Sequence, residues 1–145
     1  MSCPWAWPRR RRAIVLLALC CAGCGERGPH VVPVSGTVTR HGKPVENVVV
    51  HFVPENGRES WGATDPAGHY TLHYDRQREG AVTGKHRVWV EVRPKNPKEE
   101  AALAAGTLPL HPQIDQILAK YGDRQNSPLF VEVQDGEPAL DLKLD

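Results

Sequence analysis

Residues 87–92, Arg-Val-Trp-Val-Glu-Val, give the clearest indication of the fold, because valines alternate along them with other side chains at a period of two. In an extended chain the three valines fall on one face, and Arg87, Trp89 and Glu91 fall on the other. Such alternation is typical of a strand that packs one face against a core. It predicts an antiparallel β-sheet, in which this is the longest strand.

The same alternation continues on both sides of this stretch, and turn residues separate the runs about every ten positions. Apolar side chains lie on both faces around His51, so we expect residues 48–53 to form a central strand. Asp65, Pro66 and Gly68 occupy the places that they favour in a type I turn. We therefore expect an all-β fold, a seven-stranded antiparallel sandwich. Its predicted strands are residues 34–39, 48–53, 61–64, 70–74, 87–92, 129–133 and 140–144. We expect the last two to form a hairpin through a turn at Asp135 and Gly136.

A long insertion before the last two strands, residues 94–128, does not alternate. Asn96 and Pro97 are typical of a helix start, so we expect a helix through residues 98–105 that offers little apolar surface. Pro112 begins a second stretch with apolar residues at helical spacing, which predicts a short helix packed on the sandwich. These apolar residues are Ile114, Ile117, Leu118 and Tyr121.

The first 23 residues have the order of regions typical of a signal peptide. Arg9–Arg12 form a positive segment, and residues 13–22 form an apolar run that is too short to span a membrane. Ala22 and Gly23 then precede Cys24, which resembles the lipobox of bacterial lipoproteins, although Cys21 stands where that motif usually has Leu. We predict a signal peptide over residues 1–23 and a lipid on Cys24. An ordinary secretory signal, or a start placed too early, remains the alternative.

Residues 24–33 carry several Gly and Pro and read as a tether between the lipidated cysteine and a domain at residues 34–145. The chain is therefore expected to be exported and anchored in a membrane. Gly25, where Asp would retain a lipoprotein, resembles the pattern for sorting to an outer membrane, so we expect an outer-membrane or periplasm-facing location. The export route stays open.

Charge and cysteine content argue against a nucleic-acid-binding protein and against a domain stabilised by disulfides. Arg9–Arg12 lie in the leader, so from Cys24 onward 14 basic residues face 17 acidic ones, a net charge of −3. A nucleic-acid partner is not expected of such a chain. All four cysteines lie in the first 24 residues, so a chain cut before Cys24 forms no internal disulfide, and its fold depends on packing alone.

Several motifs of the domain, in their order along the chain, resemble one family, the transthyretin-like or carboxypeptidase regulatory-like domain of small bacterial lipoproteins. The resemblance extends from Val34 to Leu144. It implies a prealbumin-like (Ig-like) sandwich and an accessory or binding role, not peptidase activity. The motifs are Val34-Ser-Gly-Thr-Val38, Gly42-Lys-Pro-Val45, Val50-His-Phe-Val-Pro54, Asp65-Pro-Ala-Gly-His-Tyr70, Gly84-Lys85, Val88-Trp-Val90 and Leu129-Phe-Val-Glu-Val133.

No catalytic or metal-binding pattern stands out in the domain. It lacks a Gly-x-Ser-x-Gly elbow and a His-Glu-x-x-His helix. His69 and His73 are four residues apart, about 13 Å along a strand, which is too far to hold one ion. We therefore expect no enzyme activity, no cofactor and no metal. Trp61 and Trp89 are the candidate contact surface, against the simpler reading that they pack across strands.

The sequence thus predicts a non-enzymatic, lipid-anchored β-sandwich of the cell envelope with a binding or structural role. Its expected partners are a membrane, reached through the lipid, and a protein or glycan that the sequence does not identify. The alternative is an accessory subunit of an envelope or secreted complex, recruited by strand-edge pairing. A third class, an adhesin-like domain with an isopeptide bond, needs a buried lysine on the first strand, and residues 34–40 contain no lysine.

Overall fold

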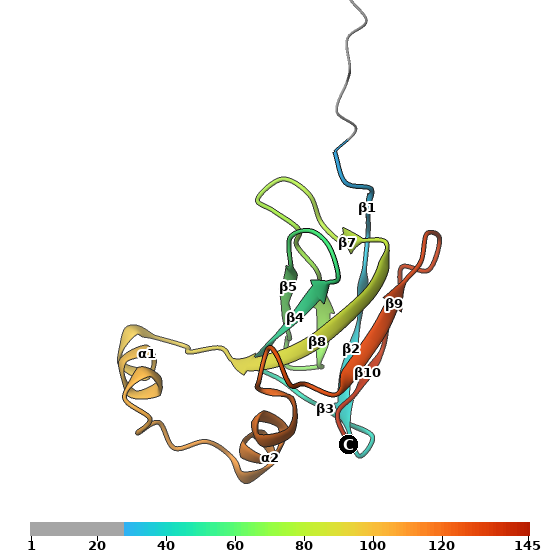
Figure 1. Ribbon diagram of the computed structural model, residues 1–145. Coiled ribbons are helices and arrows are strands. Elements are labelled where there is room, and N and C mark those ends of the chain that lie inside the picture. The colour runs from blue at the N-terminus through green and yellow to red at the C-terminus, as the bar shows by residue number, and fades with distance from the viewer. Residues whose placement is uncertain (1–27) are drawn as a thin grey trace, which may run out of the picture.

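The computed structural model describes residues 28–145, and these residues form ten strands and two short helices (Figure 1). The predicted signal peptide and Cys24 lie outside the described residues. The strands are β1 (Val31–Val32), β2 (Ser35–Arg40), β3 (Lys43–Pro44), β4 (Val48–Pro54), β5 (Ser60–Ala63), β6 (His69–Thr71), β7 (Ala81–Val82), β8 (Gly84–Val92), β9 (Leu129–Val133) and β10 (Leu142–Lys143). The helices are α1 (Pro97–Ala104) and α2 (Pro112–Tyr121).

One sheet has the antiparallel order β5-β4-β8-β9 and contains the alternating strand of residues 87–92. β8 is nine residues long, and it pairs with β4 from Val48 opposite Val92 to Pro54 opposite His86. Its valines face inward and are buried, as their alternation predicts. β4 lies between two neighbours, which confirms the expected central strand.

The other sheet is built around β2. β10 pairs with one side of β2, and β3 and β6 pair with it in antiparallel register. Gly36 in β2 has no room for a side chain, because an added Cβ would lie 2.1 Å from the carbonyl oxygen of Leu140. The last segment of the chain therefore packs directly against the backbone of β2.

The path of the last strand differs from the expectation. We expected residues 140–144 to return as a hairpin beside residues 129–133, but β9 pairs with β8 and β10 pairs with β2 in parallel. Bonds that hold the crossing segment join Ser35 N to Pro138 O at 2.7 Å and Leu144 N to Thr39 O at 2.8 Å. A hairpin needs only a short loop, whereas the chain between β9 and β10 is long enough to cross to the facing sheet.

Each of the seven expected strands overlaps a strand of the structure, but the count of seven is not confirmed. Three two-residue strands, β1, β3 and β7, add to it among the described residues. β1 lies in the segment interpreted as a tether, where Val31 pairs with Val82 and Val32 is buried at 4% exposure. The folded domain therefore begins before Val34. The short ribbon forms because Val32 buries its side chain in the core.

A single core lies between the sheets, and α2 completes it at the end where β8 finishes (Figure 1). The architecture is that of an all-β sandwich with two short helices. α1 follows its predicted cap, since the Asn96 side chain accepts a hydrogen bond from Glu99 N, and it buries no residue. The buried core residues are Val32, Val34, Val38, Val45, Val48, Val50, Phe52, Tyr70, Leu72, Ala81, Val88, Val90, Ile117, Tyr121, Val133, Leu142 and Leu144.

Candidate functional site

The outer face of the β5-β4-β8-β9 sheet carries a row of aromatic side chains. His51 of β4 pairs in register with Trp61 of β5 on one side and with Trp89 of β8 on the other. Residues paired directly across strands point to the same face, and this face is opposite to the valines of the core. The two tryptophans of the predicted contact surface therefore lie on one face, separated by a histidine.

His51 is held tightly in the middle of this row. Its ring stacks on Trp89 with centroids 4.0 Å apart and planes 12° apart. Its Nε2 lies 3.0 Å from Glu91 Oε1, and its Nδ1 lies 3.8 Å from Glu59 Oε1. Both ring nitrogens thus face carboxylates of the protein, so the ring is a packed structural group.

The two tryptophans differ in what they offer to a partner. Trp89 is half-buried because it packs on His51, as the simpler reading of its position proposed. Trp61 lies at the sheet edge beside the His73 ring, 5.3 Å between centroids, and 46% of it is exposed. Trp61 is therefore available for contact with a partner, whereas Trp89 packs on its neighbour His51.

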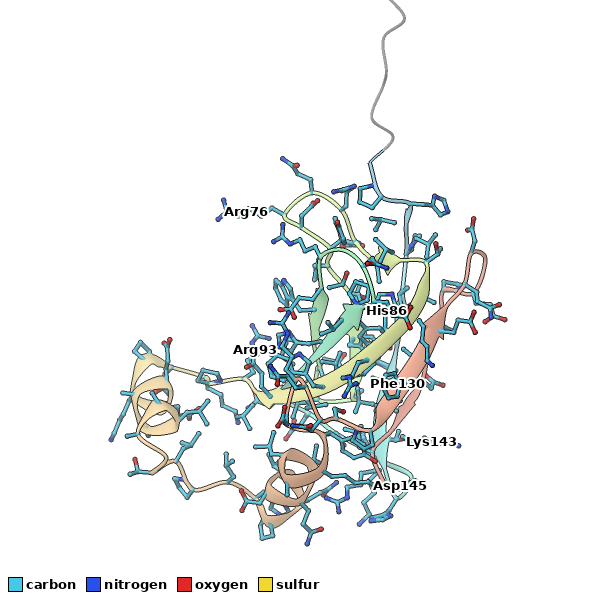
Figure 2. All side chains as sticks on the ribbon, in the orientation of Figure 1. Arg76, His86, Arg93, Phe130, Lys143 and Asp145 are labelled. Carbon is cyan, nitrogen blue, oxygen red and sulfur yellow. The ribbon has the colours of Figure 1, made fainter. Side chains whose placement is uncertain are left out.

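Phe130 is a surface residue that the sequence reasoning missed. It lies on β9, at the other edge of the same face, and it is 48% exposed (Figure 2). The signal was present in the alternation of residues 129–133, where Phe130 falls between the inward Leu129 and Val131. In the part of the chain that the structure describes, Trp61 and Phe130 are the exposed large hydrophobic side chains.

Cations surround Phe130. Lys85 Nζ lies 5.3 Å from the centre of the Phe130 ring, and Arg87 Cζ lies 4.8 Å from it. Arg87 also donates hydrogen bonds to the carbonyl oxygens of Gln125 and Ser127, in the loop after α2. Beside these groups is an open cavity of about 390 Å³. The residues that line it are Val53, Pro54, Glu55, Lys85, His86, Arg87, Arg124, Gln125 and Phe130.

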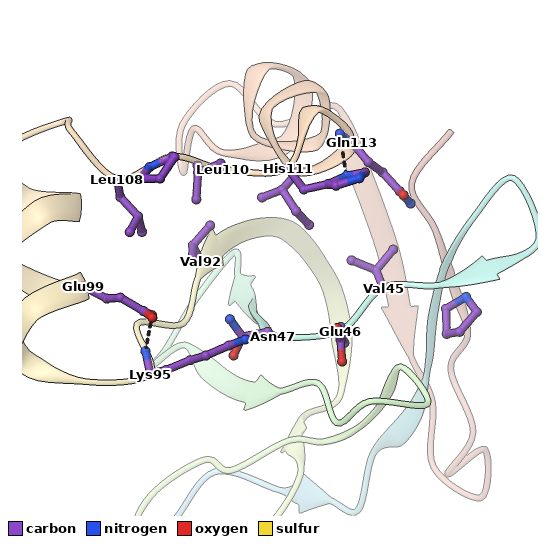
Figure 3. A pocket seen from close by; sticks show the side chains of 13 residues that line it. Val45, Glu46, Asn47, Val92, Lys95, Glu99, Leu108, Leu110, His111 and Gln113 are labelled. Atoms are coloured by element: carbon purple, nitrogen blue, oxygen red, sulfur yellow. Dashed lines mark hydrogen bonds between the residues drawn. The ribbon is translucent and has the colours of Figure 1, made fainter.

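A second cavity, of about 460 Å³, lies between the sandwich and the segment that joins the two helices (Figure 3). Leu108, Leu110 and Val92 give it apolar walls. Two of its polar side chains, Glu99 and His111, are engaged in helix capping. The backbone N–H of Lys95 donates to a Glu99 carboxylate oxygen, and His111 Nδ1 accepts from the Gln113 N–H. These two side chains are therefore not free to orient a ligand in this cavity.

The histidines do not gather into one site. His30 pairs with Asp135 at 3.1 Å, and His69 lies 3.7 Å from Asp65. Among residues 28–145, no group of three His, Cys, Asp or Glu side chains is arranged to hold a metal ion. His86 is fully buried, and burial lowers its pKa.

Comparison with family models, with curated proteins and with solved structures finds no match to this chain. Neither α1 nor α2, the helices of the described residues, is long and apolar enough to cross a bilayer. The function therefore has to be argued from the geometry of the chain itself, and the outer face with Trp61 and Phe130 is its strongest feature.

Proposed function

We propose that the chain is an exported, lipid-anchored and non-enzymatic β-sandwich module that binds a partner on the outer face of its β5-β4-β8-β9 sheet. One observation carries the proposal. Trp61 and Phe130 are exposed at 46% and 48%, and they lie on the two edge strands of the same face. Exposed aromatic side chains are favoured anchors at interfaces, because they bury a large area with few rotatable bonds.

The finer identity of the sandwich belongs to the same proposal. The resemblance to the transthyretin-like, carboxypeptidase regulatory-like domain suggests a prealbumin-like arrangement of β2, β4, β5, β6, β8, β9 and β10. Such a domain would have an accessory or binding role. The geometry of His51 is in keeping with this role, since its ring is stacked on Trp89, its Nε2 is bonded to Glu91, and its Nδ1 is buried.

The lipid anchor is tested through Cys24. Cys24→Ser should block incorporation of radiolabelled fatty acid and release the protein from the membrane fraction. Cys20→Ser, just upstream of the four lipobox positions, is the matched control and should be labelled like the wild type. If wild-type protein takes up no label, the chain has no lipid anchor.

The binding face is tested by capture from native membranes after mild crosslinking. The double variant Trp61→Ala and Phe130→Ala should lose the material that the wild type captures, because each truncation removes an exposed anchor. Leu110→Ala, at the second cavity, is the control and should capture normally. The opposite pattern would place the site in the second cavity and contradict the proposal.

Recruitment by strand-edge pairing is the second candidate, and the position of β9 favours it. β9 ends the sheet, so it pairs with β8 on one side only. A partner strand added there would protect the backbone amides of residues 129–133 from hydrogen exchange. Binding on the outer face would instead leave those amides unchanged. The isopeptide alternative finds no support, because every lysine among residues 28–145 is exposed.

A further inference from the structure

Positive charge is concentrated at one corner of the outer face. Lys85 and Arg87 project from β8, and Arg124 approaches from the loop after α2, around the cavity of about 390 Å³. Glu55 is the one carboxylate among the residues that line this cavity. The corner is thus cationic, although the chain from Cys24 onward has a net charge of −3. A local charge opposite to that of the surrounding protein favours an anionic ligand.

Two of these cations have no carboxylate partner. Arg124 forms an ion pair with Glu59 at 3.1 Å, but within residues 28–145 neither Lys85 nor Arg87 has a carboxylate within 4 Å. Glu132 lies opposite Lys85 in register without forming an ion pair. The hydrogen bonds of Arg87 to backbone carbonyls position its guanidinium, and Asp123 acts on its charge only through space, without an ion pair.

The nearest acidic side chain of the loop is occupied in its own turn. Asp123 accepts hydrogen bonds from the Asn126 side chain at 2.7 Å and from the Gln125 N–H at 2.7 Å. These bonds lower the pKa of Asp123, and the bond from the Asn126 side chain has the largest effect. Its carboxylate therefore stabilises the loop that lines the cavity and does not close the corner.

Phe130 adds an apolar surface to this positive corner. Its ring is 48% exposed while Lys85 and Arg87 lie about it at 5.3 and 4.8 Å from the ring centre. A ligand that fits both features carries an anionic group beside an apolar face. Glu55 and Gln125, on the same walls, can bind hydroxyl groups.

We infer, on the basis of the proposed function, that this corner binds an acidic glycan, in which a sugar ring carries a carboxylate. The C–H face of the ring would pack on Phe130, its carboxylate would lie at Lys85 and Arg87, and its hydroxyls would meet Gln125 in the open cavity. The same face continues toward Trp61, three strand spacings or about 14 Å across the sheet, so neighbouring sugars have an aromatic surface to follow.

The test is calorimetric titration of the full chain in detergent with oligosaccharides of galacturonate, of glucuronate and of N-acetylneuraminate. At least one acidic sugar should bind, and its methyl ester, which lacks the charge, should bind roughly tenfold more weakly or worse, as expected when a charged hydrogen bond is lost. Added salt should weaken the binding of the acidic sugar and leave the binding of the ester unchanged.

Variants place the binding site. Lys85→Gln and Phe130→Ala should each weaken the binding of the acidic sugar by roughly tenfold. Both side chains are exposed, so the fold should tolerate the two substitutions. Lys143→Gln, on β10 in the facing sheet, is the matched control and should bind like the wild type. Equal loss in Lys143→Gln would mean a general charge effect and would overturn the assignment.

Two other results would contradict the binding of an acidic glycan and leave the proposed function intact. One is that no acidic sugar binds while the wild type still captures membrane material through Trp61 and Phe130. The other is that an acidic peptide of four glutamates binds as tightly as the best sugar, which would make the partner a protein. If capture through Trp61 and Phe130 fails as well, the proposed function itself is wrong.

Discussion

At the scale of single residues, His86 is the clearest case of a polar group placed inside the core. Its side chain is fully buried, its Nε2 donates to the Val82 carbonyl at 2.8 Å, and its Nδ1 has no partner among residues 28–145. Its ring lies 5.9 Å from that of Phe52. Burial disfavours the charged imidazolium, which lowers the pKa of His86 from its ordinary value of 6.5.

The buried His86 should make the fold sensitive to acid. An unfolded chain takes up a proton on His86 near pH 6.5, and the folded chain does so only at lower pH. Below about pH 6.5 the unfolded state therefore binds more protons, and the free energy of unfolding falls as the pH decreases. Urea denaturation at a series of pH values measures this slope.

The variants that assign this slope are His86→Gln and His69→Gln. The first removes the titrating group and keeps a donor for Val82, so its stability should fall less steeply between pH 7 and 5, as for any protein without a buried neutral histidine. His69 is exposed, so its variant should follow the wild type. A slope in His86→Gln as steep as in the wild type would contradict the assignment.

Trp61 and Trp89 look equivalent in the sequence, and the structure gives them different roles. Trp89→Ala should lower the free energy of unfolding by about 2 kcal/mol or more, because it removes a half-buried ring stacked on His51. Trp61→Ala should cost less than about 1 kcal/mol, because its ring is 46% exposed. Chemical denaturation of the two variants side by side measures the difference, and equal losses would mean that Trp61 is also a packing residue.

At the scale of elements, the two helices of the insertion should contribute unequally to stability. α1 buries no residue, whereas α2 buries Ile117 and Tyr121. The Tyr121 hydroxyl also donates to the main-chain oxygen of Asp145 at 2.9 Å. α2 is therefore part of the core, and α1 is an exposed segment between β8 and α2.

This difference predicts that Tyr121→Ala destabilises the protein by about 3 to 5 kcal/mol, as for other buried aromatic residues, while removal of residues 98–105 is tolerated. Thermal unfolding of both variants gives the comparison. Tyr121→Phe is the matched control, since it keeps the ring and loses only the hydrogen bond, which contributes about 1 kcal/mol. Similar melting temperatures for Tyr121→Ala and the deletion would show that the helix is not packed.

At the scale of the whole molecule, the domain should need neither metal nor disulfide. All four cysteines precede residue 25, and the core between the two sheets is built of apolar side chains. Addition of a chelator or of a thiol should therefore leave the melting temperature unchanged, as measured by differential scanning calorimetry. A shift of several degrees with chelator would mean that the protein holds a metal ion.

Much of the secondary structure follows from local sequence patterns. The alternation in β8 and β4 predicted strands and their buried faces, and the cap at Asn96 and the apolar spacing of α2 predicted both helices. These features could be read because a strand or a helix repeats along neighbouring residues.

Strand pairing and the set of residues on the outer face follow from contacts between segments that are distant in the sequence. β10 joins β2 through contacts such as that between Thr37 N and the Asp141 carboxylate, 104 positions apart. Leu142 and Leu144 would alternate equally well in a hairpin with β9, so periodicity cannot choose between the two. Phe130 and Arg124 likewise meet Lys85 only because β9 and the loop before it fold back on β8. Pairing and convergence depend on contacts between distant segments, and no local repeat encodes them.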